Sequence, residues 1–575
     1  MSSNSAVTVT NNGINITVNA IPTITGTTPA SRCGSGTLTL GASASAGTIN
    51  WYANATGSSS LGSGTSFTTP SISSNTTYWV DASNNGCTSA TRTAVIATIA
   101  KNYWIGTNTN WNDPANWCAG VPTKGVIPTL NAVIPSGLTN YPIILAGAPA
   151  GYVKTLVLEN NTTLTVNENN LRITENLKLD GKIDLEGESQ LLQDLGSTLD
   201  PTSSGTLERD QQGTADTFTY NYWSSPVGLP NNTTNNNSYT LPDIFQGITF
   251  LTSGYNGSPS PLGIADYWIW KFSNKTSADY SQWSHVRSSG TLIAGEGFTM
   301  KGPGTGSIST PQNYVLAGKP NNGDINLSIS VGNDYLVGNP YPSALDADQF
   351  ILDNGLTIAG PGSTTGTLYF WEHWGGGSHY LADYQGGYAT YSLSGGVPAA
   401  SLGTNDPLVA TGGIPTKIPG RYIPVAQGFF VTAENSGTIK FNNGQRVFQI
   451  EDGSNSLFIK QSNTKKSQSS ENKQQSDIRT KLRLGFNSPS TIRRQILATI
   501  DQRASINYDW GFDSKYIDEQ VDDMYWMIND EKYVIQGLNE FTLETILPLG
   551  IHTKKAGEIK ITIDNIAVSY THLRA

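Results

Sequence analysis

The chain has 575 residues and a formal net charge of −10, and it has no stripe of Lys and Arg that could neutralise phosphates, which excludes nucleic-acid binding through a basic surface. No stretch approaches the roughly 18 apolar residues of a membrane span. The length predicts three to five domains, and 60 glycines and 28 prolines without long helical periodicity predict an all-β, turn-rich chain.

Short alternating segments between residues 21 and 99 predict an immunoglobulin-like sandwich. They are TLTL (37–40), TINWYA (48–53), SFTT (66–69), TTYWVDA (76–82) and TAVIATI (93–99), at a spacing typical of sandwich strands. This region resembles the immunoglobulin-like repeats of surface proteins in gliding and cellulose-degrading Bacteroidetes, through the segments 27–53 and 78–95. Residues 1–20 are similar to the last strand of a preceding repeat.

Three cysteines divide unevenly over this part of the chain. Cys33 and Cys87 enclose Trp51, and we predict a disulfide between them, which suits an exported protein. Two free buried thiols are the alternative. Cys118 then has no partner, and it is predicted to be a single buried or reactive thiol.

Residues 103–200 begin with three tryptophans, Trp104, Trp111 and Trp117. They would form either a sugar-stacking platform or a plug for the end of the structure that follows, and the plug is favoured. Between 131 and 195, short apolar segments such as AVI (132–134) and KIDLEG (182–187) recur too closely for full hairpins. Asn and Gly occupy the corners, so we predict the rungs of a short β-solenoid.

Residues 205–450 contain a weak internal repeat. Three pairs of segments occur in the same order in both halves: SP (225–226) with YP (341–342), WIW (268–270) with YFW (369–371), and GF (297–298) with GF (428–429). The repeat predicts two related β-sandwich halves, which form one core or two. The segment ALDADQFI (344–351) predicts a short helix capped by an aspartate.

The strongest candidates for a ligand face in this region are Trp371, Glu372, His373, Trp374 and Tyr380, with His379 and Asp383 nearby. On a strand, Glu372 and Trp374 would share one face and Trp371 and His373 the other, which argues against a single site. A glycosidase needs two carboxyl groups at close range, and Glu296 is the partner considered for Glu372. Packing with an exposed edge is favoured over a ligand face, and no catalytic residue is assigned.

Residues 451–477 are predicted to be a linker, because their polar, charge-rich composition cannot bury enough apolar surface to fold. The β-sandwich module predicted at 478–566 contains DWGFD (509–513), DDMYW (522–526) and LPLG (547–550). These motifs resemble a module near the C-termini of large surface and secreted proteins of Bacteroidetes, flavobacteria included, that leave the cell by type IX secretion. NYWSSPVG, GNPYPSALDADQF and VAQGFF in residues 205–450 resemble such cargo as well.

The two ends of the chain predict a fragment of a longer protein. No signal peptide is recognised at Met1, and the expected sorting domain does not follow residue 566. Residues 567–575 break the preceding strand pattern and are predicted to be a non-native tail.

Acidic residues crowd one segment of the C-terminal module: Asp509, Asp513, Asp518, Asp522 and Asp523. Hard cations prefer oxygen ligands, so a surface Ca²⁺ is one interpretation. The spacing does not match an EF-hand loop, and a solvated acidic face around a core of Trp510, Phe512, Tyr525 and Trp526 is favoured. No other metal or cofactor is expected.

Two classes of function follow from these features. The favoured one is a non-enzymatic, adhesin-like surface or secreted protein, extracellular or on the outer cell surface, that binds a polysaccharide or a host or cell-surface protein. The alternative is a carbohydrate-binding or polysaccharide-degrading protein that uses residues 205–450. Neither class involves nucleic acid or a membrane span.

Overall fold

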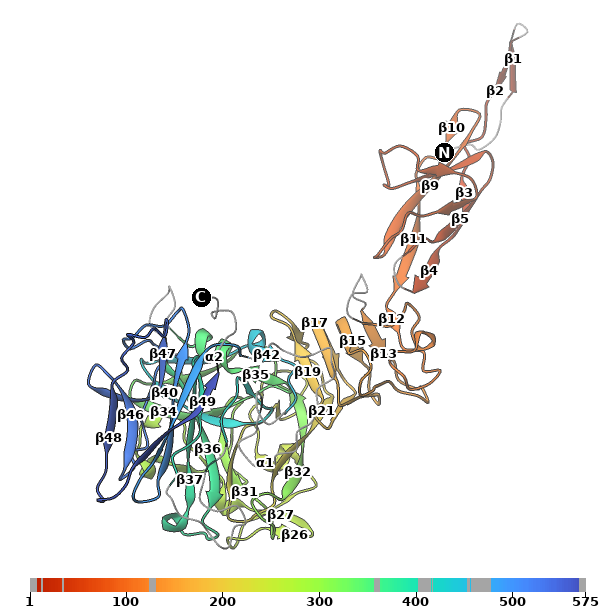
Figure 1. Cartoon of the computed structure of the whole chain (residues 1–575). Helices are drawn as coiled ribbons and strands as arrows, with labels where there is room; N and C mark the ends of the chain where they lie inside the picture. Colours follow the sequence, from red (N-terminus) through yellow and green to blue (C-terminus); the bar gives the residue numbers. More distant parts are fainter. Residues whose placement is uncertain are drawn as a thin grey trace. The chain divides into compact units, whose positions relative to one another are not determined.

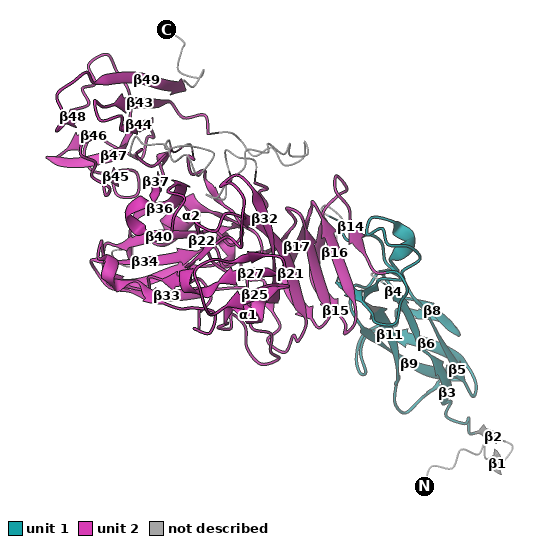
Figure 2. Ribbon diagram, turned by 90° about the horizontal axis from the view of Figure 1, so that it is seen from below, with its two compact units in different colours: residues 1–140 teal, residues 141–575 magenta. Residues whose placement is uncertain are grey.

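The structure is a computed structural model that describes residues 8–11, 14–33, 36–123, 131–355, 362–401, 415, 417–451, 456 and 477–567. The chain forms two compact units, residues 1–140 and 141–575 (Figure 2). Its regular structure is almost entirely β, as predicted (Figure 1). Most of the predicted linker 451–477 and of the tail 567–575 lies outside the described residues. Within the described ranges, no helix is long and apolar enough to cross a membrane.

The first unit contains the predicted immunoglobulin-like sandwich. One sheet has the order β4 (Ala30–Cys33), β11 (Thr93–Ala100), β9 (Thr76–Asn84), β6 (Thr48–Tyr52) and β7 (Gly62–Ser63), with β10 (Cys87–Thr88) beside β9. The other has the order β3 (Ile24–Thr28), β5 (Thr39–Ala44) and β8 (Ser66–Thr68). Trp51 is fully buried between them and stacks on Phe67 with ring centroids 5.4 Å apart. The hairpin of β1 (Thr8–Asn11) and β2 (Ile14–Thr17) precedes the sandwich.

The disulfide of this unit joins Cys33 to Cys118, so the predicted pairing of Cys33 with Cys87 is wrong, and Cys118 is not a single thiol. β4 pairs in parallel with β11, which places Cys33 beside Ala100 at the end of β11. β9 runs antiparallel to β11, so Cys87 in the β9–β10 hairpin lies at the opposite end of the sheet. A disulfide cannot span the length of a strand. Cys87 is a free, half-buried thiol.

The three tryptophans after the sandwich are buried, which excludes an exposed sugar-stacking platform. Their segment includes β12 (Asn102–Tyr103), the 3₁₀ turn η1 (Pro114–Asn116) and β13 (Ala132–Ile134). Trp117 packs edge-on against Trp104 and Trp111, with ring centroids 5.2 and 4.7 Å apart. Their indole N–H groups donate to backbone carbonyls of Asn140, Pro122 and Trp111, which compensates for their burial.

The second unit begins with the predicted β-solenoid. Its strands are β14 (Ile143–Ile144), β15 (Gly151–Leu158), β16 (Thr163–Asn167), β17 (Asn170–Leu179), β18 (Lys182–Glu186), β19 (Gln190–Gln193), β20 (Thr198–Leu199) and β21 (Thr206–Thr214). Alternate strands pair in parallel, β15 with β17, β16 with β18, and β18 with β21. The registers stack buried leucines above one another, as in Leu156, Leu177 and Leu199. These ladders fill the interior between the two sheets.

Residues 205–320 are called the first half of the middle region. Their further elements are β22 (Tyr220–Trp223), β23 (Val227–Gly228), α1 (Leu241–Ile244), β24 (Phe245–Gln246), β25 (Thr249–Leu251), β26 (Ser258–Pro259), β27 (Leu262–Ala265), η2 (Asp266–Trp268), β28 (Trp270–Lys271), β29 (Lys275–Thr276), η3 (Tyr280–Gln282), β30 (Ser284–His285), β31 (Phe298–Lys301) and β32 (Pro311–Pro320). β32 pairs antiparallel with β21 and so joins this half to the solenoid sheet.

Residues 321–450 are called the second half. Their elements are β33 (Ile325–Ile329), β34 (Asn333–Gly338), β35 (Ala344–Asp346), α2 (Ala347–Asp353), β36 (Thr364–Gly375), η4 (Leu381–Asp383), β37 (Gln385–Ser392), β38 (Gly395–Val397), β39 (Tyr422–Ile423), β40 (Gly428–Ala433), β41 (Gly437–Phe441), η5 (Asn443–Gln445) and β42 (Arg446–Val447). The predicted helix is α2, and Asp346 caps it by accepting from the N–H groups of Asp348 and Gln349.

The internal repeat corresponds to a reciprocal pairing of the two halves. In the first half Trp223 of β22 pairs with Phe298, and in the second half Val337 of β34 pairs with Phe429. Each strand then crosses over: Trp223 bridges to Gln427 and Val337 bridges to Glu296. Equivalent residues thus make reciprocal contacts, and Trp223 corresponds to Val337. This equivalence matches Pro226 with Pro340. The sequence repeat predicted Pro342, which lies two residues further along the chain.

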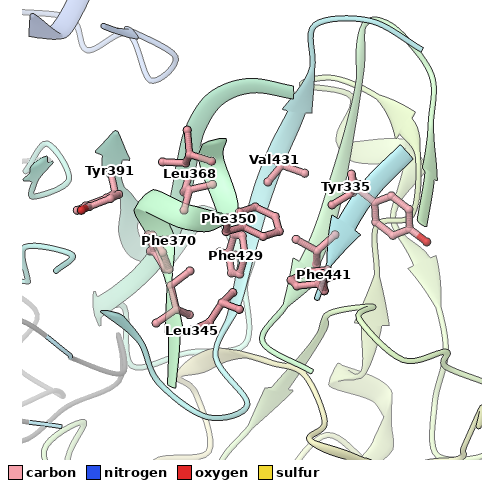
Figure 3. Close-up of a cluster of buried hydrophobic side chains, with 14 of the residues drawn as sticks. Tyr335, Leu345, Phe350, Leu368, Phe370, Tyr391, Phe429, Val431 and Phe441 are labelled. Carbon is pink, nitrogen blue, oxygen red and sulfur yellow. The ribbon is translucent and has the colours of Figure 1, made fainter. Parts of the chain in front are cut away.

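The two halves share a hydrophobic core. Tyr222 and Phe272 of the first half pack with Leu336, Tyr369 and Phe430 of the second half in one buried cluster. A larger cluster in the second half surrounds α2 and the strands that cover it (Figure 3). Its labelled residues include Phe350 of α2, Phe370, Phe429 and Phe441.

The C-terminal module packs directly against the second half. Its sheet has the order β48 (Leu549–His552), β46 (Asp523–Ile528), β47 (Glu531–Leu538), β44 (Arg493–Ile500), β43 (Lys481–Asn487) and β49 (Lys560–Ala567), with β45 (Ser514–Lys515) beside β47.

The prediction that Trp510 and Phe512 belong to the module's own core is wrong. Phe512 belongs to the core around α2, and Trp510 packs against that core. A Cβ on Gly355 would lie 2.0 Å from the Trp510 ring, so only glycine admits the indole there. Trp526, by contrast, packs in the core of the module's sheet. The insertion of residues 509–513 explains why this module and the middle region form one compact unit.

Candidate functional site

The predicted ligand residues of β36 are divided between the two faces of the strand, because neighbouring side chains alternate. Trp371 is half-buried and stacks on Tyr222, with ring centroids 6.1 Å apart and 14° between the planes. Glu372 and Trp374 are buried. The backbone N–H of Lys417 donates to Glu372 at 3.3 Å. β36 therefore contributes its rings and its carboxylate to packing.

His373 is a structural histidine. Its Nδ1 accepts a hydrogen bond from the backbone N–H of Tyr220 at 3.1 Å, and its Nε2 lies 2.7 Å from the carbonyl of Gly375. These partners require a neutral ring that carries its proton on Nε2. Burial and, to a smaller extent, the positive charge of Lys301 lower the pKa of His373 to about 3. Both ring nitrogens are thus used within the fold.

The two carboxylates that could have formed a catalytic pair are held by different structural partners. Glu296 accepts hydrogen bonds from Lys271 at 3.1 Å, Ser273 at 2.7 Å and Tyr335 at 2.9 Å. This network ties the turn before β31 to β28 and β34 and compensates for the burial of the charge. The structure gives Glu296 a role in joining the halves.

An exposed group of aromatic rings lies on the first half and on one loop of the second half. We call it the aromatic face, and its members are Tyr255, Tyr267, Trp270, His285, His379 and Tyr380. Tyr255 is 56% exposed and Tyr380 is 77% exposed. Large exposed aromatic groups of this kind are uncommon on soluble proteins and are associated with binding sites.

Trp270 and His285 form the centre of the aromatic face. They are directly opposite each other on the paired strands β28 and β30, and their rings stack at 4.0 Å with 7° between the planes. His285 is exposed and Trp270 is half-buried. The ring of Tyr267 stands edge-on to His285 at 5.2 Å, and its carbonyl lies 2.9 Å from Nε2 of His285. The outer ring of the stack is therefore held in a fixed orientation.

An ion pair between the buried Asp266 and the partly exposed Arg287 supports this arrangement. Asp266, in the 3₁₀ turn before Tyr267, accepts hydrogen bonds from Arg287 at 3.1 Å and from the hydroxyl of Ser288 at 2.9 Å. Asp266 is buried, whereas the guanidinium is 42% exposed. The pair fixes the chain that follows β30 against the turn that carries Tyr267.

The second half supplies His379 and Tyr380 from the loop between β36 and β37. His379 stacks on the buried Trp268 at 4.7 Å, and its Nε2 donates to the side-chain oxygen of Asn256 at 2.7 Å. Tyr255, beside Asn256, packs edge-on against Tyr267 at 4.9 Å. Contacts between the two loops thus extend the aromatic face across both halves.

Lys301 lies under the aromatic face in a cage of rings. Its Nζ is 3.8 Å from the ring centre of Trp268, 4.5 Å from that of Tyr220 and 4.7 Å from that of Tyr384. It also donates to the Tyr384 hydroxyl at 2.7 Å and to Nδ1 of His379 at 3.3 Å. Burial lowers the pKa of Lys301 to about 7, and Asp216 opposes this effect. The three ring faces stabilise the cation as well.

His379 is neutral because of its burial and, to a smaller extent, because of the same lysine. Burial lowers the pKa of His379 to about 4, and the charge of Lys301 contributes in the same direction. A neutral ring is also what lets Nδ1 accept from the lysine ammonium. The hydrogen bond from Lys301 to His379 therefore holds β31 of the first half against the loop between β36 and β37 of the second half.

The aspartates considered for calcium do not converge. Asp513 accepts from the backbone N–H groups of Gly537 and Asp509, and burial raises its pKa to about 7. Asp522 accepts from the N–H of Lys554 at 2.8 Å.

A separate network involves Asp518 and Asp523, both of which bind Arg494. Asp523 and Arg494 are buried. In the part of the chain that the structure describes, no three acidic, His or Cys side chains are grouped to hold a metal.

Sequence reasoning missed most of the aromatic face. The sequence predicts a role for WIW (268–270) only as half of a repeat. It does not predict that Tyr255, His285 and Lys301 lie close to this segment. The signal that could have found them is the density of aromatic residues in DYWIWKF (266–272), beside the turn-rich and polar segment 273–290. Of the candidate ligand residues of the sequence, Tyr380 and the neighbouring His379 belong to the face.

Two family matches cover nearly the whole chain. Residues 20–100 match an immunoglobulin-like domain described as CHU_C associated, in agreement with the sandwich of the first unit. No curated protein and no solved structure matches. Residues 103–573 match a single family across the solenoid, both halves and the C-terminal module, and the chain therefore belongs to the family described as a domain of unknown function (DUF8693).

Proposed function

We propose that this chain acts as an exported, adhesin-like binding protein without catalytic activity, outside the cell or on its outer surface. The observation that carries the proposal is the aromatic face, whose exposed rings are held in place by stacking, by the ion pair of Asp266 and Arg287, and by Lys301. A rigid, solvent-facing group of rings suits the binding of a ligand that is not transformed.

Export is supported by features far from the aromatic face. The immunoglobulin-like domain is of the CHU_C-associated type, and the disulfide between Cys33 and Cys118 suits an oxidising environment. The motifs DWGFD (509–513) and DDMYW (522–526) resemble modules of type IX secretion cargo from Bacteroidetes. We therefore include type IX secretion in the proposal.

Binding is favoured over turnover by the state of the nearby carboxylates. Asp266 is paired with Arg287, and Glu296 accepts from three side chains. A glycosidase needs one carboxyl group free to donate a proton and a second free to act on sugar or water. Carboxylates with structural partners of this kind contribute to stability instead.

The partner proposed is a polysaccharide or a protein on a host or cell surface. The test uses the oxidised full chain on beads, presented to immobilised polysaccharides, extracellular-matrix proteins and whole cells, with albumin-coated beads as the control. We expect saturable retention on at least one surface and no release of reducing sugar ends over a day. Retention equal to that of albumin, or sugar release that grows with time, would contradict the proposal.

A further inference from the structure

We infer that the aromatic face binds a neutral polysaccharide, with a sugar ring lying on the exposed side of His285 and neighbouring sugars against Tyr255 and Tyr380. This inference rests on the proposed function and names the class of its ligand. It also places the site away from Trp371 and Trp374, which the sequence suggested.

The first argument is the chemistry of the exposed rings. A pyranose presents C–H groups on its flat side and hydroxyl groups around its edge, so it needs an apolar ring with polar groups beside it. His285 offers an exposed ring backed by Trp270 at 4.0 Å. The amide of Asn256 and the half-exposed guanidinium of Arg287 supply polar groups at the edge of the same surface.

The second argument is the kind of apolar surface. In the described segments 251–285 and 376–384, the large hydrophobic residues with high exposure are Tyr255, Tyr280, Tyr380 and Leu381. Three of these four are tyrosines, which combine a flat ring with a hydroxyl group. A protein-docking patch would need a broader, well-packed apolar centre that excludes water. The tyrosines favour a hydrated ligand.

The third argument is charge. The basic residue beside the stack, Arg287, is paired with Asp266, and Lys271 is paired with Glu296. Burial lowers the pKa of His285, and Arg287 contributes in the same direction, so the ring is neutral at neutral pH. The whole chain is acidic as well, with a net charge of −10. These charges disfavour an acidic polysaccharide and select a neutral one.

The fourth argument is rigidity. Tyr267 contacts His285, Trp270 and Tyr255 through ring edges, and His379 is fixed by Asn256 and Lys301. A ligand that stacks on these rings does not have to order them first, which reduces the entropic cost of binding. Each sugar of a polysaccharide can stack on a ring that is already held in place. Shallow contacts of this kind therefore suit a chain of repeated sugars.

The test is affinity electrophoresis of the full chain in gels that contain soluble β-glucan, xylan, galactomannan or arabinan, followed by titration calorimetry with oligosaccharides of any retarding polymer. His285→Ala and Tyr255→Ala should each weaken binding at least tenfold. Tyr103→Ala removes an exposed tyrosine of the first unit and should leave binding unchanged. Unfolding midpoints like that of the parent chain show that the variants are folded.

The outcomes separate this inference from the function on which it rests. Unchanged affinity in His285→Ala and Tyr255→Ala, or retardation only by polygalacturonate or heparin, overturns the inference. If none of the neutral polymers binds while beads still adhere to proteins or cells, the saccharide inference fails and the adhesin-like function stands. If the beads adhere to nothing, both fail.

Discussion

The two halves of the middle region place the third ring of equivalent aromatic segments in different surroundings. In the first half, WIW (268–270) follows a 3₁₀ turn and enters the two-residue strand β28, and Trp270 reaches the surface under His285. In the second half, YFW (369–371) lies inside the long strand β36, where Tyr369 and Phe370 are buried. Burial agrees position by position, since Trp270 and Trp371 are both half-buried, but Trp270 stacks on the exposed His285 whereas Trp371 stacks on the buried Tyr222.

The difference comes from the neighbours of each strand. Tyr369 of β36 faces Tyr222 and Phe272 of the first half, and Phe370 faces the cluster that includes Phe512 of the C-terminal module. β28 pairs only with the short strand β30 among the described residues. The third ring of each segment therefore meets a buried or an exposed partner according to the elements beside it.

The largest expected effect compares a buried ring of one segment with the half-buried ring of the other. Phe370→Ala removes a ring that is 3% exposed and should lower the free energy of unfolding by about 4 kcal/mol, through lost burial and a cavity. Trp270→Ala at the echoing segment should cost less than about 1 kcal/mol, because its ring is partly solvated. Urea denaturation measures both. Similar losses for the two variants would contradict the contrast between core and surface.

The next effect tests whether the C-terminal module stabilises the second half by packing against its core. Phe512→Ala should lower the free energy of unfolding by about 3 kcal/mol and should speed amide exchange in β36 and β37, because the ring belongs to their core. Phe541→Ala, which trims the module's own core, is the matched control. Faster exchange in β36 with the control as well would mean that the module stabilises the region in some other way.

The caged lysine gives a pH-dependent prediction for the first half. The pKa of Lys301 is about 7 in the folded protein and is near 10.5 when unfolded, so the unfolded state binds the extra proton between these values. The free energy of unfolding should therefore rise by about 2 kcal/mol as the pH increases from 7 to 9.5. This value is reduced to account for the stabilisation of the ammonium by the three rings.

Lys301→Met should remove this rise, whereas Lys560→Met at an exposed site should keep it. Denaturation midpoints at pH 6.5 and 9.5 provide the comparison. A rise in Lys301→Met equal to that of the parent chain would show that another group is responsible.

The smallest effect addresses the crossover between the halves. Glu296→Gln keeps the shape of the side chain but removes the charge that binds Lys271, Ser273 and Tyr335, and it should cost about 1 kcal/mol. Its counterpart Gln427 donates to the carbonyls of Tyr222 and Gly428 and needs no charge. Saccharide binding by Glu296→Gln should equal that of the parent chain. A selective loss of binding with unchanged stability would give Glu296 a direct role at the face.

Local patterns predicted much of the fold. Alternation in residues 37–99 located the sandwich strands, and the tight recurrence of apolar pairs in 131–195 predicted the parallel solenoid ladders. The Asp346 cap of α2 was predicted from a few residues. These features depend on neighbours in sequence, where periodicity and capping rules apply directly.

Long-range choices were predicted less well. The partner of Cys33 depends on which end of β11 lies beside β4, and sequence spacing does not contain that register. Trp510 and Phe512 were assigned to their own module, because an insertion into another core leaves no local signal. The exposure of His285 and the burial of Trp374 likewise depend on distant elements.

The sequence by itself determined the all-β class, the immunoglobulin-like domain, the solenoid and the presence of a duplication, because each follows from a periodic or repeated pattern. Only the tertiary structure decided that Trp270 stacks on an exposed ring and Trp371 on a buried one, which cysteines are joined and how Lys301 and His379 link the two halves. These features arise where segments far apart in the chain meet, and the free energy of such contacts is set by burial and register that no local pattern specifies.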